Sequence, residues 1–68
     1  MADEHTSGQR EHMRRLVAKL GRNQDAVCAA YADAERSGLV MRAKNTTGHS
    51  PEEYALALWR DGERKGWL

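Results

Sequence analysis

The sequence predicts a small all-α domain of three helices. The chain has 68 residues, which is room for one domain. Apolar residues recur at helical spacing in successive segments, and glycines and capping residues separate those segments. Residues 1–8 are polar and show no period, so we expect a disordered tail there and a single domain over residues 9–68.

The first helix is expected over residues 9–20. Its apolar residues follow the i, i+3, i+4, i+7 spacing of an amphipathic helix: Met13, Leu16, Val17 and Leu20. Gly21 is the natural stop, because glycine tolerates the left-handed conformation that ends many helices.

The second helix begins after Asn23, a good N-cap, and has Asp25 in its first turn. It is rich in alanine, which has the highest helix propensity. Its inward stripe is predicted to consist of Val27, Ala30, Tyr31 and Ala34. Gly38 ends the helix, and a short extended segment is expected near residues 39–43.

The third helix is expected over residues 51–65, because "SPEE" supplies an N-cap at Ser50, a proline at the first helical position and an acid at Glu53. Gly66 is suited to end it, with Trp67 folding back on the last turn. The expected core of the whole domain is Leu16, Val17, Leu20, Val27, Tyr31, Leu39, Val40, Tyr54, Leu58 and Trp59, with Trp67 at its edge.

The composition narrows the possible functions. A lone cysteine, no apolar leader and no run of about 18 apolar residues predict a cytoplasmic protein without a membrane partner. The three histidines and Cys28 lack the close spacing of zinc ligands. A chain this short is not expected to enclose a substrate pocket of about 300 Å³ or more. We therefore expect no metal, no cofactor, no small-molecule substrate and no enzymatic activity.

The cations are unevenly distributed although the net charge is only +1. Residues 10–22 hold five cations against the single acid Glu11: Arg10, Arg14, Arg15, Lys19 and Arg22. Residues 36–49 hold three more and no acid: Arg36, Arg42 and Lys44. Such clustering is compatible with one basic face, and also with a solvated surface of scattered charges.

The phrase "LGRNQDAV", residues 20–27, joins the first two helices. Apolar residues precede Gly21, an N-cap follows it, and Val27 lies six positions beyond it, as in a helix-turn-helix corner. A plain turn between two packed helices is the competing interpretation.

Residues 16–42 resemble helix-turn-helix modules, and the stretch "YADAERSGLVMR" resembles the end of a winged-helix recognition helix entering its wing. The resemblance implies a partner of double-stranded DNA, with the start of the second helix in the major groove. It implies base contacts from Arg22, Asn23 and Gln24, and backbone contacts from Arg14, Arg15, Arg42 and Lys44. Asp25, Asp33 and Glu35 on the same helix are unfavourable to a phosphate backbone.

The alternative is a protein-interaction module, either a homodimer or an accessory subunit. Its contacts would come from small residues of the second helix, Ala29 and Ala32, or from Trp67 in the terminal "KGWL". Neither function is catalytic: the first is that of a nucleic-acid-binding or regulatory module, and the alternative is that of an interaction module. They differ in salt dependence, because phosphate binding weakens steeply as salt rises and helix packing does not.

Overall fold

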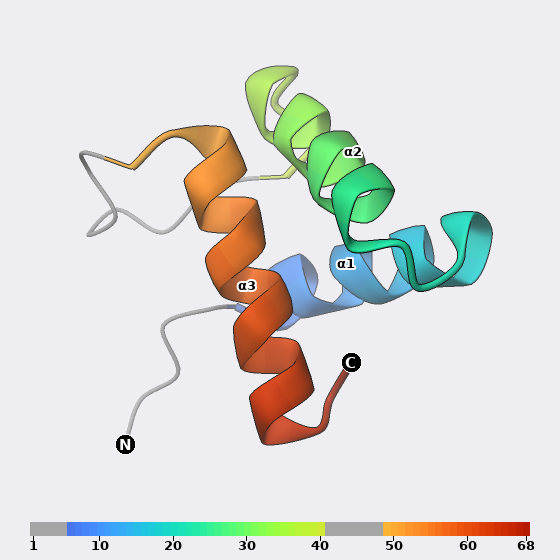
Figure 1. Ribbon diagram of the computed structural model, residues 1–68. Helices are drawn as coiled ribbons and strands as arrows, with labels where there is room; N and C mark the ends of the chain where they lie inside the picture. The colour runs from blue at the N-terminus through green and yellow to red at the C-terminus, as the bar shows by residue number, and fades with distance from the viewer. Residues whose placement is uncertain (1–5, 41–48) are drawn as a thin grey trace.

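The computed structural model describes residues 6–40 and 49–68, and in that part of the chain it contains three helices and no strand. The helices are α1 (Ser7–Leu20), α2 (Gln24–Arg36) and α3 (Pro51–Lys65). Figure 1 shows α2 and α3 side by side, with α1 crossing behind them. The all-α fold class predicted from the sequence is therefore confirmed.

Helix α1 begins two residues earlier than expected, at Ser7, within the stretch predicted to be a disordered tail. The Thr6 hydroxyl accepts a hydrogen bond from the Gln9 backbone at 3.2 Å, and the Gln9 side chain accepts one from the Thr6 backbone at 2.8 Å. This reciprocal capping box satisfies two amides that the helix start otherwise leaves without partners. Residues 1–5 lie outside the described part.

The other predicted helix boundaries agree with the structure. Gly21 has a φ of 80° and follows α1, and the Asn23 side chain caps α2 by accepting from the Ala26 amide at 3.2 Å. Ser50 caps α3 in the same way, accepting from the Glu53 amide at 3.2 Å. Its hydroxyl also donates to the Glu53 carboxylate, and this contact lowers the pKa of Glu53.

The segment after α2 bends around the helix end instead of running on as an extended strand. Gly38, with a φ of 82°, donates to the Glu35 carbonyl at 3.2 Å, and Leu39 donates to the Ala34 carbonyl at 2.9 Å. This is the double hydrogen bond of a Schellman cap. Residues 41–43 of the expected extended segment lie outside the described residues.

The core lies where the three helices meet. Its fully or nearly buried apolar residues are Met13, Val27, Tyr31, Ala32, Ala34, Val40, Tyr54, Ala55, Leu58 and Trp59. Two residues predicted for the core are exposed: Leu20 by 41% and Leu39 by 79%. Leu20 is the last residue of α1, and Leu39 lies beyond the cap of α2. Both therefore lie at helix ends, outside the region where the three helices meet. Leu16 and Val17 are half-buried against the core.

Helices α2 and α3 run antiparallel. Arg36 at the end of α2 pairs with Glu52 at the start of α3, whereas Arg22, just before α2, pairs with Glu63 near the end of α3. None of the helices in residues 6–40 and 49–68 combines the length and apolar character needed to cross a bilayer.

Candidate functional site

The corner between α1 and α2 is a turn of three residues, 21–23. Every residue from Gly21 to Ala26 is exposed, so the start of α2 is open to solvent. Asn23, predicted to meet a base edge, uses its side-chain oxygen to cap α2. The corner has the position predicted from the sequence, but one of its base-reading candidates already has a structural role.

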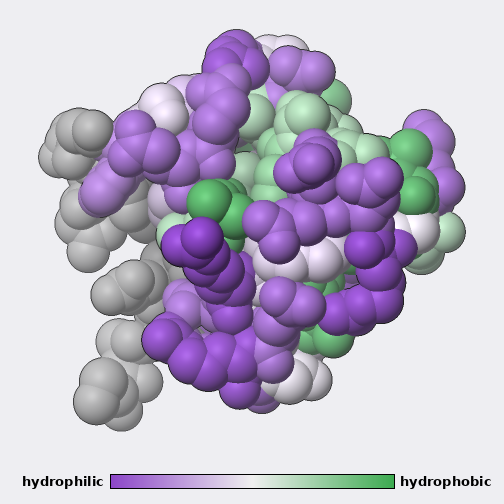
Figure 2. Space-filling view, viewed as in Figure 1, coloured by the Kyte–Doolittle hydropathy of each residue, from purple (hydrophilic) through white to green (hydrophobic). Residues whose placement is uncertain are grey.

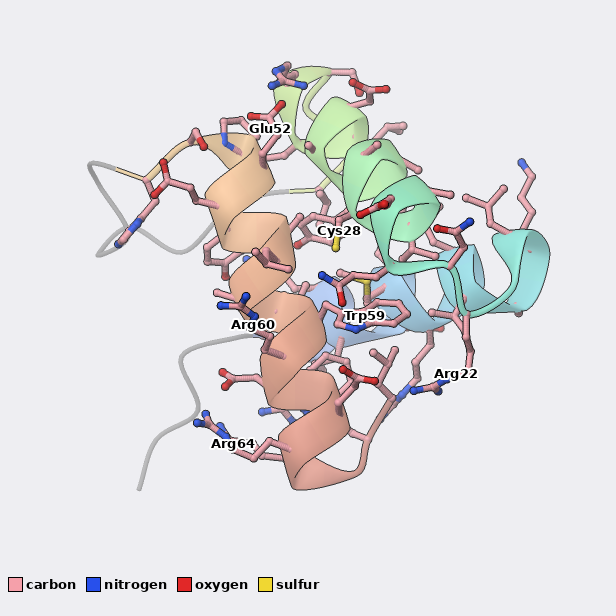
Figure 3. The ribbon with its side chains drawn as sticks, viewed as in Figure 1. Arg22, Cys28, Glu52, Trp59, Arg60 and Arg64 are labelled. Carbon is pink, nitrogen blue, oxygen red and sulfur yellow. The ribbon has the colours of Figure 1, made fainter. Side chains whose placement is uncertain are left out.

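Arg22 turns back onto α3. Its guanidinium carbon lies 5.7 Å from the centre of the Trp59 ring, and one of its nitrogens lies 3.4 Å from a Glu63 carboxylate oxygen. The other oxygen of Glu63 accepts the Trp59 indole N–H at 2.9 Å. Figure 3 shows Arg22 reaching from the turn toward Trp59. Cation, carboxylate and ring thus form one closed network that fixes the turn against α3.

Arg14 is held in a comparable way by the chain terminus. Its guanidinium carbon lies 5.6 Å from the centre of the Trp67 ring, and its Nε donates to the Trp67 carbonyl at 2.7 Å. Arg10, one turn earlier on α1, lies 5.7 Å from the same ring. Trp67 therefore makes its main polar contacts within the chain, and it is half-buried rather than presented as a free anchor.

A glycine on α3 makes room for this terminal segment. A Cβ at Gly62 would lie 2.6 Å from the Cβ of Leu68 and 3.1 Å from the Trp67 ring. The Leu68 amide donates to the Gly62 carbonyl at 3.2 Å, and Gly66 has the left-handed conformation that reverses the chain. The predicted return of Trp67 onto the last turn of α3 is confirmed.

The remaining predicted nucleic-acid contacts do not join these arginines. Arg15 forms an ion pair with Glu11 at 2.9 Å on the exposed side of α1. Gln24 is the exposed first residue of α2 and lies on the side of that helix that faces α3. Arg42 and Lys44 lie outside the described residues. The structure thus brings no set of uncommitted cations together among the described candidates.

The exposed face of α2 differs from the one expected for groove binding. Asp25 and Asp33 are exposed on it, with Ala29 between them in sequence. Ala32, predicted as a partner contact, is completely buried, because it lies on the side of α2 that is covered within the domain. It cannot contribute to an intermolecular surface, whereas Ala29 can.

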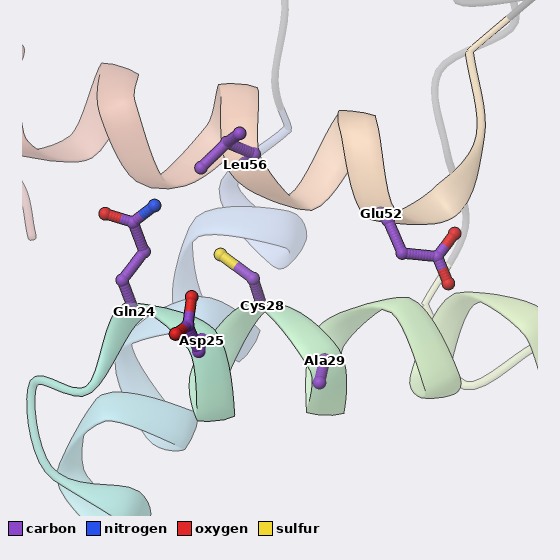
Figure 4. Close-up of a pocket in the computed structure, with 6 residues that line it drawn as sticks. All are labelled: Gln24, Asp25, Cys28, Ala29, Glu52 and Leu56. Atoms are coloured by element: carbon purple, nitrogen blue, oxygen red, sulfur yellow. The ribbon is translucent and has the colours of Figure 1, made fainter.

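A hollow of about 250 Å³ opens between α2 and α3. Figure 4 shows Gln24 and Cys28 directed from α2 toward α3, and Leu56 directed back from α3. The six lining residues are Gln24, Asp25, Cys28, Ala29, Glu52 and Leu56. Leu56 and Glu52 were not singled out from the sequence, since only the antiparallel packing of the two helices brings them beside Ala29.

Ion pairs between helices flank the hollow along the α2–α3 contact. Arg36 pairs with Glu52 on one side, and Arg22 with Glu63 on the other. Asp25 forms no ion pair with any residue of the described chain. In Figure 2, pale green surface over α2 adjoins a darker green patch over α3, bordered by hydrophilic residues. Most of the exposed surface of the lining is apolar, and Asp25 is a lining carboxylate without an ion pair among the described residues.

Cys28 lies half-buried in this hollow as a free thiol. Burial raises its pKa, and the nearby Asp25 carboxylate raises it further. A thiol held protonated is a poor nucleophile, so the chemistry available here is packing and hydrogen bonding.

A second hollow, of about 430 Å³, lies between α1 and the end of α2. It is lined by His12, Leu16, Ala30, Asp33, Ala34, Ser37 and Leu39. Ala34 and Leu39 are already used by the Schellman cap that ends α2. Within the described residues, no group of histidine, cysteine and acidic side chains is arranged to hold a metal ion.

Comparisons with protein-family models, with curated proteins and with solved structures find no match to this chain.

Proposed function

We propose that this chain is a small non-catalytic protein-interaction module that docks a partner protein on the face formed by α2 and α3. The observation that carries the proposal is the mainly apolar hollow between these helices, which includes the exposed Ala29 and the half-buried Leu56. An apolar recess bordered by charged residues is a common form of protein docking surface.

Charge argues for a different protein rather than a second copy of the chain. If two copies of α2 crossed antiparallel at Ala29, Asp25 of each would face Asp33 of the other, because both lie four residues from Ala29. A parallel pair would place each acid beside its own counterpart. Either arrangement opposes like charges, which weakens association.

The test uses two matched substitutions of exposed alanines, Ala29→Glu on the docking face and Ala18→Glu on α1. A photo-crosslinking residue introduced at the exposed Arg60, one turn from Leu56 on α3, identifies a partner, whose affinity for the purified chain is then measured by calorimetry. We expect Ala29→Glu to weaken binding at least tenfold and Ala18→Glu to change it less than twofold. Equal affinities of the two variants would reject the docking face.

A second candidate function, binding to double-stranded DNA, is favoured by the exposure of every residue from Gly21 to Ala26. It predicts an affinity for duplex DNA that falls steeply with salt, with a slope that drops by about 0.9 for each phosphate contact removed. Substitution of Arg14, Arg15 and Lys44 by alanine tests it. An unchanged affinity and salt slope in these variants would exclude this function.

A further inference from the structure

We infer that the hollow between α2 and α3 accepts one lysine or arginine side chain of the docked partner as its anchor. This inference rests on the proposed function and adds the chemistry of the group that is recognised.

The size of the hollow suits a single side chain. Its volume is about 250 Å³, whereas sites for small-molecule ligands usually measure roughly 300–1,000 Å³. A recess of this size has room for one long side chain. The hollow lies on the antiparallel contact of α2 and α3, with the ion pairs Arg36–Glu52 and Arg22–Glu63 to either side of it.

The lining fits a side chain that is apolar along its length and carries a positive charge at its end. Leu56 and Ala29 supply the apolar walls. Lysine and arginine pack their methylene groups on such surfaces while the charged end finds a polar partner. Here the partner is Asp25, which has no cation beside it among the described residues, with the Gln24 amide oxygen as a second acceptor.

The sign of the local charge selects the occupant. An acidic side chain would enter between the carboxylates of Asp25 and Glu52 and be repelled. A neutral apolar side chain would shield Asp25 from water without offering it a hydrogen-bond donor, which costs free energy. Burial is the main cause of the raised pKa of the Cys28 thiol, and the negative charge of Asp25 raises it further.

The experiment compares two small probes by NMR titration of the backbone amides. Nα-acetyl-lysine methylamide carries the ammonium, and Nα-acetyl-norleucine methylamide has a similar aliphatic stem without it. We expect the lysine probe to shift amides of residues 24–29 and 52–56 and to bind at least threefold more tightly than the norleucine probe. Asp25→Asn should abolish that preference. Asp33→Asn, two turns further along α2 at a carboxylate that pairs with Arg36 and does not line the hollow, should leave it unchanged.

Each alternative outcome overturns the inference. Equal binding of both probes would mean that the hollow selects by apolarity alone, and no shift with either probe would mean that it holds no side chain. Tighter binding of spermidine than of the lysine probe would assign the hollow to a free polyamine. The proposed function is decided separately, by Ala29→Glu and Ala18→Glu with the intact partner.

Discussion

The two tryptophans of the chain have similar partners and different surroundings. Trp59 is 2% exposed in the contact between α2 and α3, whereas Trp67 is half-buried between α3 and α1. Arginine guanidinium groups lie about the same distance from each ring: Arg22 at Trp59, and Arg10 and Arg14 at Trp67.

The difference separates two ways of joining helices. At Trp59 the ring is embedded in the core, and Arg22 adds to packing that is already complete. At Trp67 the arginines form a large part of the contact, because α1 and α3 touch directly over a smaller area than α2 and α3 do. The extensively packed α2–α3 pair is therefore suited to hold a docking surface, while the junction of α1 with the terminal segment depends on a few side chains.

The largest expected effect on stability comes from replacing each tryptophan by alanine. Trp59→Ala should reduce the free energy of unfolding by about 3–5 kcal/mol, since it leaves a cavity in the core. Trp67→Ala should cost about 1–2 kcal/mol, because the ring is only half-buried and its cation–π contacts are partly solvated. Urea unfolding followed by circular dichroism measures both. Equal losses would contradict the distinction between the two junctions, and Trp59→Phe is the control for retained packing.

A smaller effect is expected from the ion pair between Arg22 and Glu63, which lies beside Trp59. In a double-mutant cycle, Arg22→Ala and Glu63→Gln should show a coupling of about 0.5–1 kcal/mol, since both side chains are about half exposed. The coupling should decrease as salt is added. Additive losses would indicate that Arg22 contributes through the Trp59 ring alone.

The smallest effect concerns protonation in the hollow and leaves the fold unchanged. Burial and Asp25 both raise the pKa of Cys28, so the thiolate forms at higher pH than in an unfolded chain. The folded state therefore favours the neutral thiol. The stability that this preference contributes is fully present below the pKa of the thiol in the unfolded chain, and it is lost as the pH rises through the pKa in the folded chain. Asp25→Asn should move the pH dependence of iodoacetamide alkylation to lower pH, and Asp33→Asn should not. No movement in Asp25→Asn would mean that the carboxylate does not act on the thiol.

Local chemistry was enough to predict most of the fold. The caps at Asn23 and Ser50 and the glycines at positions 21 and 38 are signals that act within four residues, and the structure confirms them. The start of α1 carried a signal of the same kind, because Thr6 and Gln9 have capping-box spacing. That spacing was missed in a stretch expected to be disordered.

Tertiary relations were not available from the sequence. The burial of Ala32 depends on which side of α2 meets the other helices, and the exposure of Leu39 depends on how the chain turns beyond the end of that helix. Apolar spacing alone specifies neither. Arg22 and Arg14 were predicted as free cations because their ring partners, Trp59 and Trp67, are far along the chain. The hollow depends in the same way on the register of α2 against α3, which brings Leu56 beside Ala29.

The two arginine-capped indoles give the molecule a pair of built-in optical reporters. With Trp67 replaced by phenylalanine, the remaining emission comes from Trp59 and reports on the turn against α3. With Trp59 replaced instead, it comes from Trp67 and reports on the carboxyl terminus against α1. Intrinsic fluorescence can therefore follow the loosening of each junction separately, without any attached dye.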